Sequence, residues 1–223
     1  NKIAAALIRA AGGYIAAPSA NRSGRPSPTV AKYVIEDLDA RVEIIIDGGF
    51  SAIGLESTII DLSEGEPMIL RPGYVTQEKM TQVIGNVDVD RTILDASSKE
   101  APKAPGMKYR HYAPKGNLTI VEGPQEKVTD CINEKLSEGH KQGLKTGVIA
   151  TDETIEQYQA DVKRSLGSRK NEEVIAHHLF EVLRQMDDEE VQLIFTESFA
   201  ETGLGQATMN RLLKAAGHQV ISL

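Results

Sequence analysis

Strand-like and helix-like segments alternate through the C-terminal half of this sequence, residues 117–223. Short runs rich in β-branched and aliphatic residues predict strands at 118–122, 146–150, 191–196 and 219–222. Segments with apolar residues at helical spacing separate them, at 125–139, 171–186 and 206–216. Strand–helix–strand units of this kind favour a parallel sheet with helices on both faces. The sequence therefore predicts a parallel α/β domain in this half of the chain.

The N-terminal half, residues 1–116, predicts a second set of α/β elements, which are shorter. Helices are expected over Lys2–Ala11, from Ser27 as the N-cap to about Leu38, and from Thr76 to about Ile84. Strands are expected at 14–17, 42–47, 55–62 and 68–71. Residues 86–116 are rich in Asp, Ser, Lys and Pro and lack a sustained period, which predicts a linker between two domains.

Composition and charge limit the partners and the location of the protein. No apolar run approaches the roughly 20 residues that span a bilayer, so we expect no membrane contact. The single cysteine, Cys131, excludes an internal disulfide framework and indicates a reducing, cytoplasmic compartment. The N-terminal half carries 14 basic and 14 acidic residues, and the C-terminal half 11 and 18, which supplies the whole net charge of −7. Because acidic surfaces repel nucleic acid, a phosphate-rich partner is expected to meet the N-terminal half.

The segment 16–29, which we call the Ser/Pro loop, is the strongest candidate for ligand binding. It combines three serines, one asparagine and two arginines with three prolines. Hydroxyls, amides and guanidinium groups bind phosphate and carboxylate oxygens, and prolines stiffen the loop that presents them. An ordinary surface turn has a similar composition, so the segment by itself leaves both interpretations open.

Three further clusters fit a ligand site. Glu56-Ser57-Thr58 opens a predicted strand, and Arg71 ends another, directly before Pro-Gly. The segment Tyr109–Tyr112 offers aromatic faces and a cation for a base or a phosphate.

Other features of the sequence do not indicate a dinucleotide, metal or nucleophile site. Gly203-Leu204-Gly205 lacks the third glycine of a dinucleotide fingerprint and is interpreted as a turn, and His177-His178 lack metal-ligand spacing. We expect no metal site, and no nucleophile motif appears, so no catalytic side chain is assigned.

Five motifs together resemble one known family. They are Pro18–Thr29, Asp47-Gly-Gly, Gly54–Thr58, Leu70–Gly73 and Pro105–Pro114. In this order they are similar to the long form of threonylcarbamoyl-AMP synthase, in which a linker joins a YrdC-like catalytic domain to a smaller Rossmann-like domain. The resemblance implies an α/β protein with three parts. They are the C-terminal half of a YrdC-like twisted-sheet domain over 1–90, a linker over 91–116 and a Rossmann-like parallel α/β domain over 117–223.

The resemblance also implies an activity. Members form L-threonylcarbamoyladenylate and pyrophosphate from ATP, L-threonine and bicarbonate, and Mg²⁺ is expected to accompany the ATP. The product serves the threonylcarbamoyladenosine modification of tRNA, so the implied partners are the downstream transfer machinery and, as a further possibility, tRNA or another RNA.

Matching the motifs residue by residue implies a set of site residues. Ser19, Ser27, Arg71 and Tyr112 would contact ATP, with Tyr109 as the alternative to Tyr112. Ala17, through its backbone, and Ser57 would contact threonine, and Asn21 would support the same loop.

One departure and two alternatives accompany the resemblance. The family's basic triphosphate-binding motif lies in a segment that would precede Asn1, so the 223 residues are expected to be N-terminally truncated and inactive by themselves. A carbamoyl-adenylate-forming carbamoyltransferase also carries a YrdC-like domain, but the tyrosine-rich linker argues against it. A non-catalytic RNA-binding translation factor is disfavoured because residues 1–116 are neutral.

Overall fold

The C-terminal half forms a parallel sheet, as the alternation predicts, but with five strands in place of the four expected. In the computed structural model, residues 1–63, 65–90, 93, 112–200 and 202–223 are described. The strands are β4 (Asn117–Glu122), β5 (Thr146–Ala150), β6 (Val162–Ser165), β7 (Leu193–Glu197) and β8 (Val220–Ser222). Their order across the sheet is β6-β5-β7-β4-β8, and every neighbouring pair is parallel. The sequence prediction missed β6, since Val162-Lys163-Arg164-Ser165 is a polar strand at the sheet edge.

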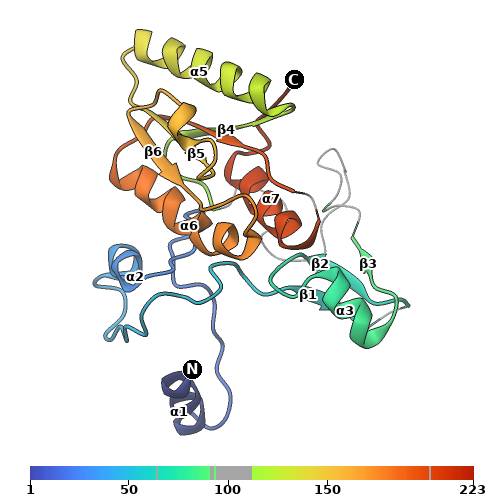
Figure 1. Cartoon of the computed structure of the whole chain (residues 1–223). Coiled ribbons are helices and arrows are strands. Elements are labelled where there is room, and N and C mark those ends of the chain that lie inside the picture. Colours follow the sequence, from blue (N-terminus) through green and yellow to red (C-terminus); the bar gives the residue numbers. More distant parts are fainter. Residues whose placement is uncertain (64, 91–92, 94–111, 201) are drawn as a thin grey trace.

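Helices cover both faces of this sheet (Figure 1). The helix α5 (Gln125–Lys141) and the 3-10 turn η1 (Ile155–Gln157) lie on one face, and α6 (Glu172–Asp188) and α7 (Gly203–Ala215) on the other. The two-residue period of β4 supplies both cores, because Leu118 and Ile120 join the α6–α7 cluster whereas Val121 joins the α5 cluster. The residues predicted as a Gly203-Leu204-Gly205 turn instead begin α7, and that interpretation was wrong.

The N-terminal half is more open. It holds α1 (Lys2–Ala10), α2 (Ala31–Leu38), α3 (Gln77–Ile84) and a small sheet of β1 (Ile59–Asp61), β2 (Met68–Arg71) and β3 (Asp88–Val89). As predicted, the Thr76 hydroxyl caps α3, accepting from the Lys79 N–H. The first helix stands apart from the rest of the molecule and buries no side chain (Figure 1).

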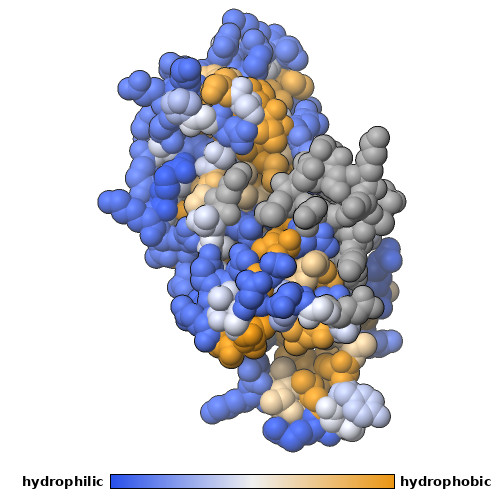
Figure 2. All heavy atoms as spheres, turned by 90° about the vertical axis from the view of Figure 1, so that its right-hand side faces the viewer, coloured by the Kyte–Doolittle hydropathy of each residue, from blue (hydrophilic) through white to orange (hydrophobic). Residues whose placement is uncertain are grey.

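Two predicted strands of this half do not form in the described part of the chain. Residues 14–17 and 42–47 run without a strand partner there, although their sequences are apolar. A strand requires a backbone ladder to a neighbour as well as suitable side chains. Most of their apolar side chains are exposed, Ile44 to 77%, whereas Ile45 is half-buried. Figure 2 shows hydrophobic patches interrupting the hydrophilic surface of the face it presents.

Two other boundaries also differ from the prediction. The strand expected at 55–62 is confined to Ile59–Asp61. The helix expected to start after Ser27 begins at Ala31, with Val30 at its N-cap and no side-chain cap. Ser27 lies four residues before the start of this helix, and its hydroxyl donates to Glu56.

Candidate functional site

A cleft of about 370 Å³ lies where the Ser/Pro loop meets the segment before β1 and the helix α6. Its walls are Ser19, Ser27, Pro28, Thr29, residues 51–56 and Phe180. We call it the loop cleft. Two of the predicted nucleotide residues, Ser19 and Ser27, therefore share one cavity. The Thr29 hydroxyl in the same wall is buried without a hydrogen-bond partner in the described part of the structure.

Glu56 connects the loop cleft to the C-terminal half. One carboxylate oxygen accepts from the Ser27 hydroxyl at 2.9 Å, and the other accepts from Arg211 Nε on α7 at 2.9 Å. Arg211 is fully buried and also donates through Nη1 to the Pro72 carbonyl oxygen at 2.6 Å. A single guanidinium group thus contacts the segment before β1 and the residue after β2.

Arg71 lies at the end of β2 and holds Ser57. Its Nε and Nη2 donate to the Ser57 carbonyl oxygen at 3.1 and 2.9 Å, and Nη2 lies 3.5 Å from the Ser57 hydroxyl. Burial, followed by the charge of Arg211, lowers the pKa of Arg71. The predicted nucleotide residue and the predicted threonine residue are therefore in direct contact.

The same region concentrates positive charge. Burial and the charges of Arg211 and Arg71 lower the pKa of Lys214, on α7, to about 8. The charges of Arg71 and Arg211 thus act on Lys214, and the charges of Arg211 and Glu56 act on Arg71. An excess of cations with little water around it suits an anionic ligand such as a phosphate chain.

Tyr112 packs into this region from the end of the predicted linker. Its side chain is 6% exposed, its ring lies 5.1 Å from that of Phe180, and its backbone has a φ of 62°. Burial, followed by the negative charge of Glu56, raises the pKa of the Tyr112 phenol. The alternative residue, Tyr109, lies outside the described residues.

A buried ion-pair network fixes the Ser/Pro loop to α2 and α6. Asn21 Nδ2 donates to the Arg22 and Arg25 carbonyl oxygens within the loop. Arg25 pairs with Asp37 of α2, and Arg184 of α6 donates both to Asp37 and to the Pro26 carbonyl oxygen. Arg184 and Asp37 are both fully buried at their side chains.

Not every predicted residue joins the loop cleft. Ala17 is exposed, and the cleft walls include neither Ala17 nor the other predicted site residues Asn21, Ser57, Arg71 and Tyr112. Conversely, the sequence analysis did not identify Phe180, Arg184 and Arg211. A signal for them exists, because Arg184 follows Phe180 by four residues and Arg211 precedes Ala215 by four, on the helix faces that are buried.

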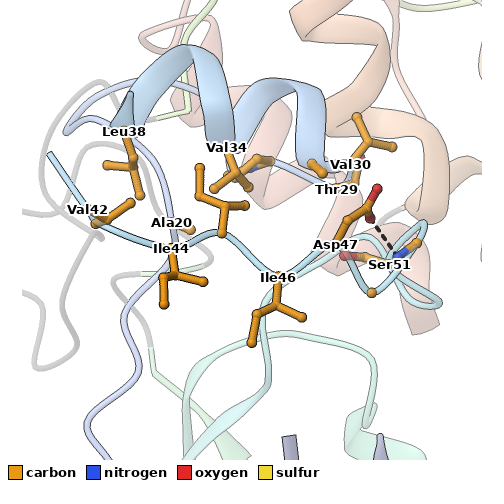
Figure 3. A pocket seen from close by; sticks show the side chains of 15 residues that line it. Ala20, Thr29, Val30, Val34, Leu38, Val42, Ile44, Ile46, Asp47 and Ser51 are labelled. Atoms are coloured by element: carbon orange, nitrogen blue, oxygen red, sulfur yellow. Dashed lines mark hydrogen bonds between the residues drawn. The ribbon is translucent and has the colours of Figure 1, made fainter. Parts of the chain in front are cut away.

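A second groove, of about 330 Å³, lies between α2 and the extended segment 42–49 (Figure 3). Val34 and Leu38 of α2 point toward the segment, whereas Ile44 and Ile46 point away from the helix. At one end, the Gly49 N–H donates to the Asp47 carboxylate at 2.8 Å. This groove shares Pro28, Thr29 and Ser51 with the loop cleft, but none of the predicted site residues lines it.

Metal clusters and membrane-spanning helices do not occur among the described residues. Across those ranges, no group of three or more His, Cys, Asp or Glu side chains is arranged to hold a metal ion. Nor does any helix in the part of the chain that the structure covers have the length and apolarity needed to cross a membrane.

The fold and the cleft define a two-part α/β protein in which a parallel C-terminal domain docks onto an N-terminal half that carries the candidate site. Two family models match the chain, one over each part. The model described as "Threonylcarbamoyl-AMP synthase, C-terminal domain" matches residues 75–217, and the model of the Sua5, YciO and YrdC sequences, described as "Telomere recombination", matches residues 1–73. The chain therefore belongs to the threonylcarbamoyl-AMP synthase family.

Individual relatives are similar along the whole chain. A threonylcarbamoyl-AMP synthase of Bacillus subtilis is 46% identical over 98% of this chain, and one of Pyrococcus abyssi is 45% identical over 100%. The crystal structure of Pyrococcus abyssi Sua5 complexed with L-threonine matches with a TM-score of 0.89 and 45% identity over 100% of this chain and 64% of that one. The chain spans 62% and 64% of the length of the Bacillus and Pyrococcus relatives.

Proposed function

We propose that the protein containing this chain synthesises L-threonylcarbamoyl-AMP and pyrophosphate from ATP, L-threonine and bicarbonate. One observation carries the proposal. The Ser27 hydroxyl of the Ser/Pro loop donates a hydrogen bond to Glu56, and Arg71 donates one to the next residue, Ser57, so the two predicted parts of the site meet there. The family membership and the relative that was solved with L-threonine support it.

The residue roles form part of this proposal. Ser19, Ser27, Arg71 and Tyr112 bind ATP, Ser57 and the backbone of Ala17 bind threonine, and Asn21 supports the loop. The domain limits 1–90, 91–116 and 117–223 are likewise proposed. Downstream, the adenylate passes to the machinery that modifies tRNA, in the cytoplasm, and any RNA contact stays a prediction.

The chemistry fits a site without a protein nucleophile. The threonine amine adds to bicarbonate with loss of water and gives a carbamate. A carbamate oxygen then attacks the α-phosphorus of ATP, and the bond to the pyrophosphate leaving group breaks. Such a transfer depends on positioning and on stabilising negative charge, which hydroxyls, backbone N–H groups and arginines provide.

Mg²⁺ is proposed to enter with ATP. Glu56, the carboxylate in the cleft wall, already accepts from Ser27 and Arg211, so it is poorly suited to bind a metal as well. The residues near the cleft would then hold the metal only through the phosphate oxygens of the nucleotide.

Arg71→Ala provides the test. With ATP, L-threonine and bicarbonate all present, the intact protein should release pyrophosphate and form an adenylate that retains threonine, and omission of threonine or bicarbonate should abolish both. Loss of a charge-assisted hydrogen bond costs roughly 1.5–3 kcal/mol, so Arg71→Ala should lower kcat/KM about 10- to 150-fold. Arg169→Gln, whose described partners all lie in the C-terminal half, is the control and should keep wild-type turnover. Pyrophosphate release that ignores threonine would contradict the proposal.

A further inference from the structure

We propose that Arg211 is a positioning residue that orients Ser27 for nucleotide binding through Glu56, so that the C-terminal half completes the substrate site. This inference rests on the proposed function. In this proposal, the C-terminal half contributes to nucleotide binding because Arg211 of α7 contacts Glu56 in the wall of the loop cleft.

The geometry leaves Arg211 little freedom. Its Nε donates to Glu56, and its Nη1 donates to the Pro72 carbonyl oxygen and, at 3.3 Å, to Asn210 Oδ1. Its side chain is 0% exposed and lies on α7, which packs against the sheet of the C-terminal half. The guanidinium group therefore holds the Glu56 carboxylate against a rigid element.

Glu56 in turn determines how Ser27 can bind. A carboxylate paired with a guanidinium is ionised and only accepts hydrogen bonds. Because the Ser27 hydroxyl donates its proton to Glu56 Oε1, a residue of the same cleft wall, its lone pairs stay available. Ser27 is thereby set to accept from a donor group of the nucleotide, such as a ribose hydroxyl or the adenine amine.

No other described cation takes the place of Arg211 on Glu56. Arg71 is near enough to interact with Glu56 electrostatically, but within the segment before β1 it donates to Ser57. Arg184 reaches the Ser/Pro loop at Pro26 and Asp37 instead. The path from α7 to Ser27 thus runs through Arg211 and Glu56.

A double-mutant cycle on ATP affinity tests this path in the intact protein. The dissociation constant for ATP is measured by calorimetry for the wild type, Ser27→Ala, Arg211→Gln and the double variant. One neutral hydrogen bond is worth about 0.5–1.5 kcal/mol, so each single variant should bind ATP about 2- to 12-fold more weakly. The double variant should bind no more weakly than Ser27→Ala, because Arg211 acts only through that hydroxyl.

Controls separate positioning from stability. Arg169→Gln removes an arginine–glutamate pair of the C-terminal half and should leave ATP affinity unchanged. If Arg211→Gln reduces the folded fraction, Glu56→Gln breaks the same path at its centre and should show the same non-additivity with Ser27→Ala.

If the losses of ATP affinity in the two single variants multiply in the double variant, the inference is overturned, whereas the proposed function still holds. A wild-type protein that forms no threonine-containing adenylate would instead refute the proposed function, whatever the cycle shows.

Discussion

Asp37 lies where the Ser/Pro loop and the C-terminal half meet. It accepts from Arg184, from Arg25 and from the Arg22 N–H, and its side chain is fully buried. Burial by itself would raise the pKa of Asp37, but the hydrogen bonds of Arg184 and Arg22 and the charges of Arg184 and Arg25 hold it below 3.8. The carboxylate therefore stays charged at neutral pH and balances two arginines.

Asp37→Asn should destabilise the protein severely, since it leaves the buried Arg184 without a counter-charge. Breaking such a pair costs about 3–5 kcal/mol. Lys32→Ala, which removes a pair between the exposed Lys32 and Asp188, is the matched control and should cost about 0–1 kcal/mol. Urea unfolding at pH 7 measures both, and equal losses would contradict the assignment of Asp37 as the centre of the network.

The same comparison has a pH dependence of known sign. Because the pKa of Asp37 is lower in the folded state, its stabilisation is present above the ordinary value of 3.8 and disappears as the pH falls through the folded pKa. The difference in unfolding free energy between the wild type and Asp37→Asn should therefore shrink below pH 3.8. A difference that stays constant into acid would show that the lost stability is unrelated to the charge of Asp37.

At the scale of elements, the segment 51–56 forms a wall of the loop cleft by lying directly on α6. Gly54 has a φ of +81°, and a Cβ there would lie 2.3 Å from the His177 carbonyl oxygen. His177 Nδ1 also lies 3.0 Å from the Ala52 carbonyl oxygen. Only glycine permits both the backbone angle and the close approach.

Gly54→Ala should therefore cost several times as much stability as a glycine substitution that affects the backbone angle alone. Gly85, with a φ of +85°, a ψ of −145° and no described atom within 4 Å of the position that a Cβ would take, provides that control, and Gly85→Ala should cost about 1–3 kcal/mol. Thermal unfolding of the two variants measures the comparison. Similar shifts in melting temperature would show that the segment does not need to touch α6.

Elements with strong local signals could be predicted from the sequence, and those that need distant partners could not. The capped α3 and the apolar β5 follow from their own residues. Val42–Asp47 has an equally apolar sequence, yet strand formation depends on a neighbour that the described residues do not supply. Ser27 has the chemistry of a cap, but α2 begins only at Ala31, and the Ser27 hydroxyl donates to Glu56, which is distant in sequence.

At the scale of the whole molecule, the predicted site residues lie in the N-terminal half or the linker, while two of their supports lie in the C-terminal half. The family motifs predict Ser19, Ser27, Ser57 and Arg71 as site residues, because a motif can be matched residue by residue in a sequence. The motifs did not identify Arg184 and Arg211, because their role comes from domain docking, which brings α6 and α7 against residues more than a hundred positions away. Helical spacing places both arginines on buried helix faces, but it does not indicate which distant residues they contact.

The central claim is that one substrate site includes both halves, and hydrogen exchange tests it most directly. Amide exchange of the intact protein is compared with and without ATP and L-threonine. Exchange should slow in the Ser/Pro loop, in residues 54–57 and in α7 around Arg211, while α5, on the opposite face of the sheet, stays unchanged. If exchange slows only in the N-terminal half, and exchange in α7 is as unchanged by the substrates as in α5, the account is contradicted.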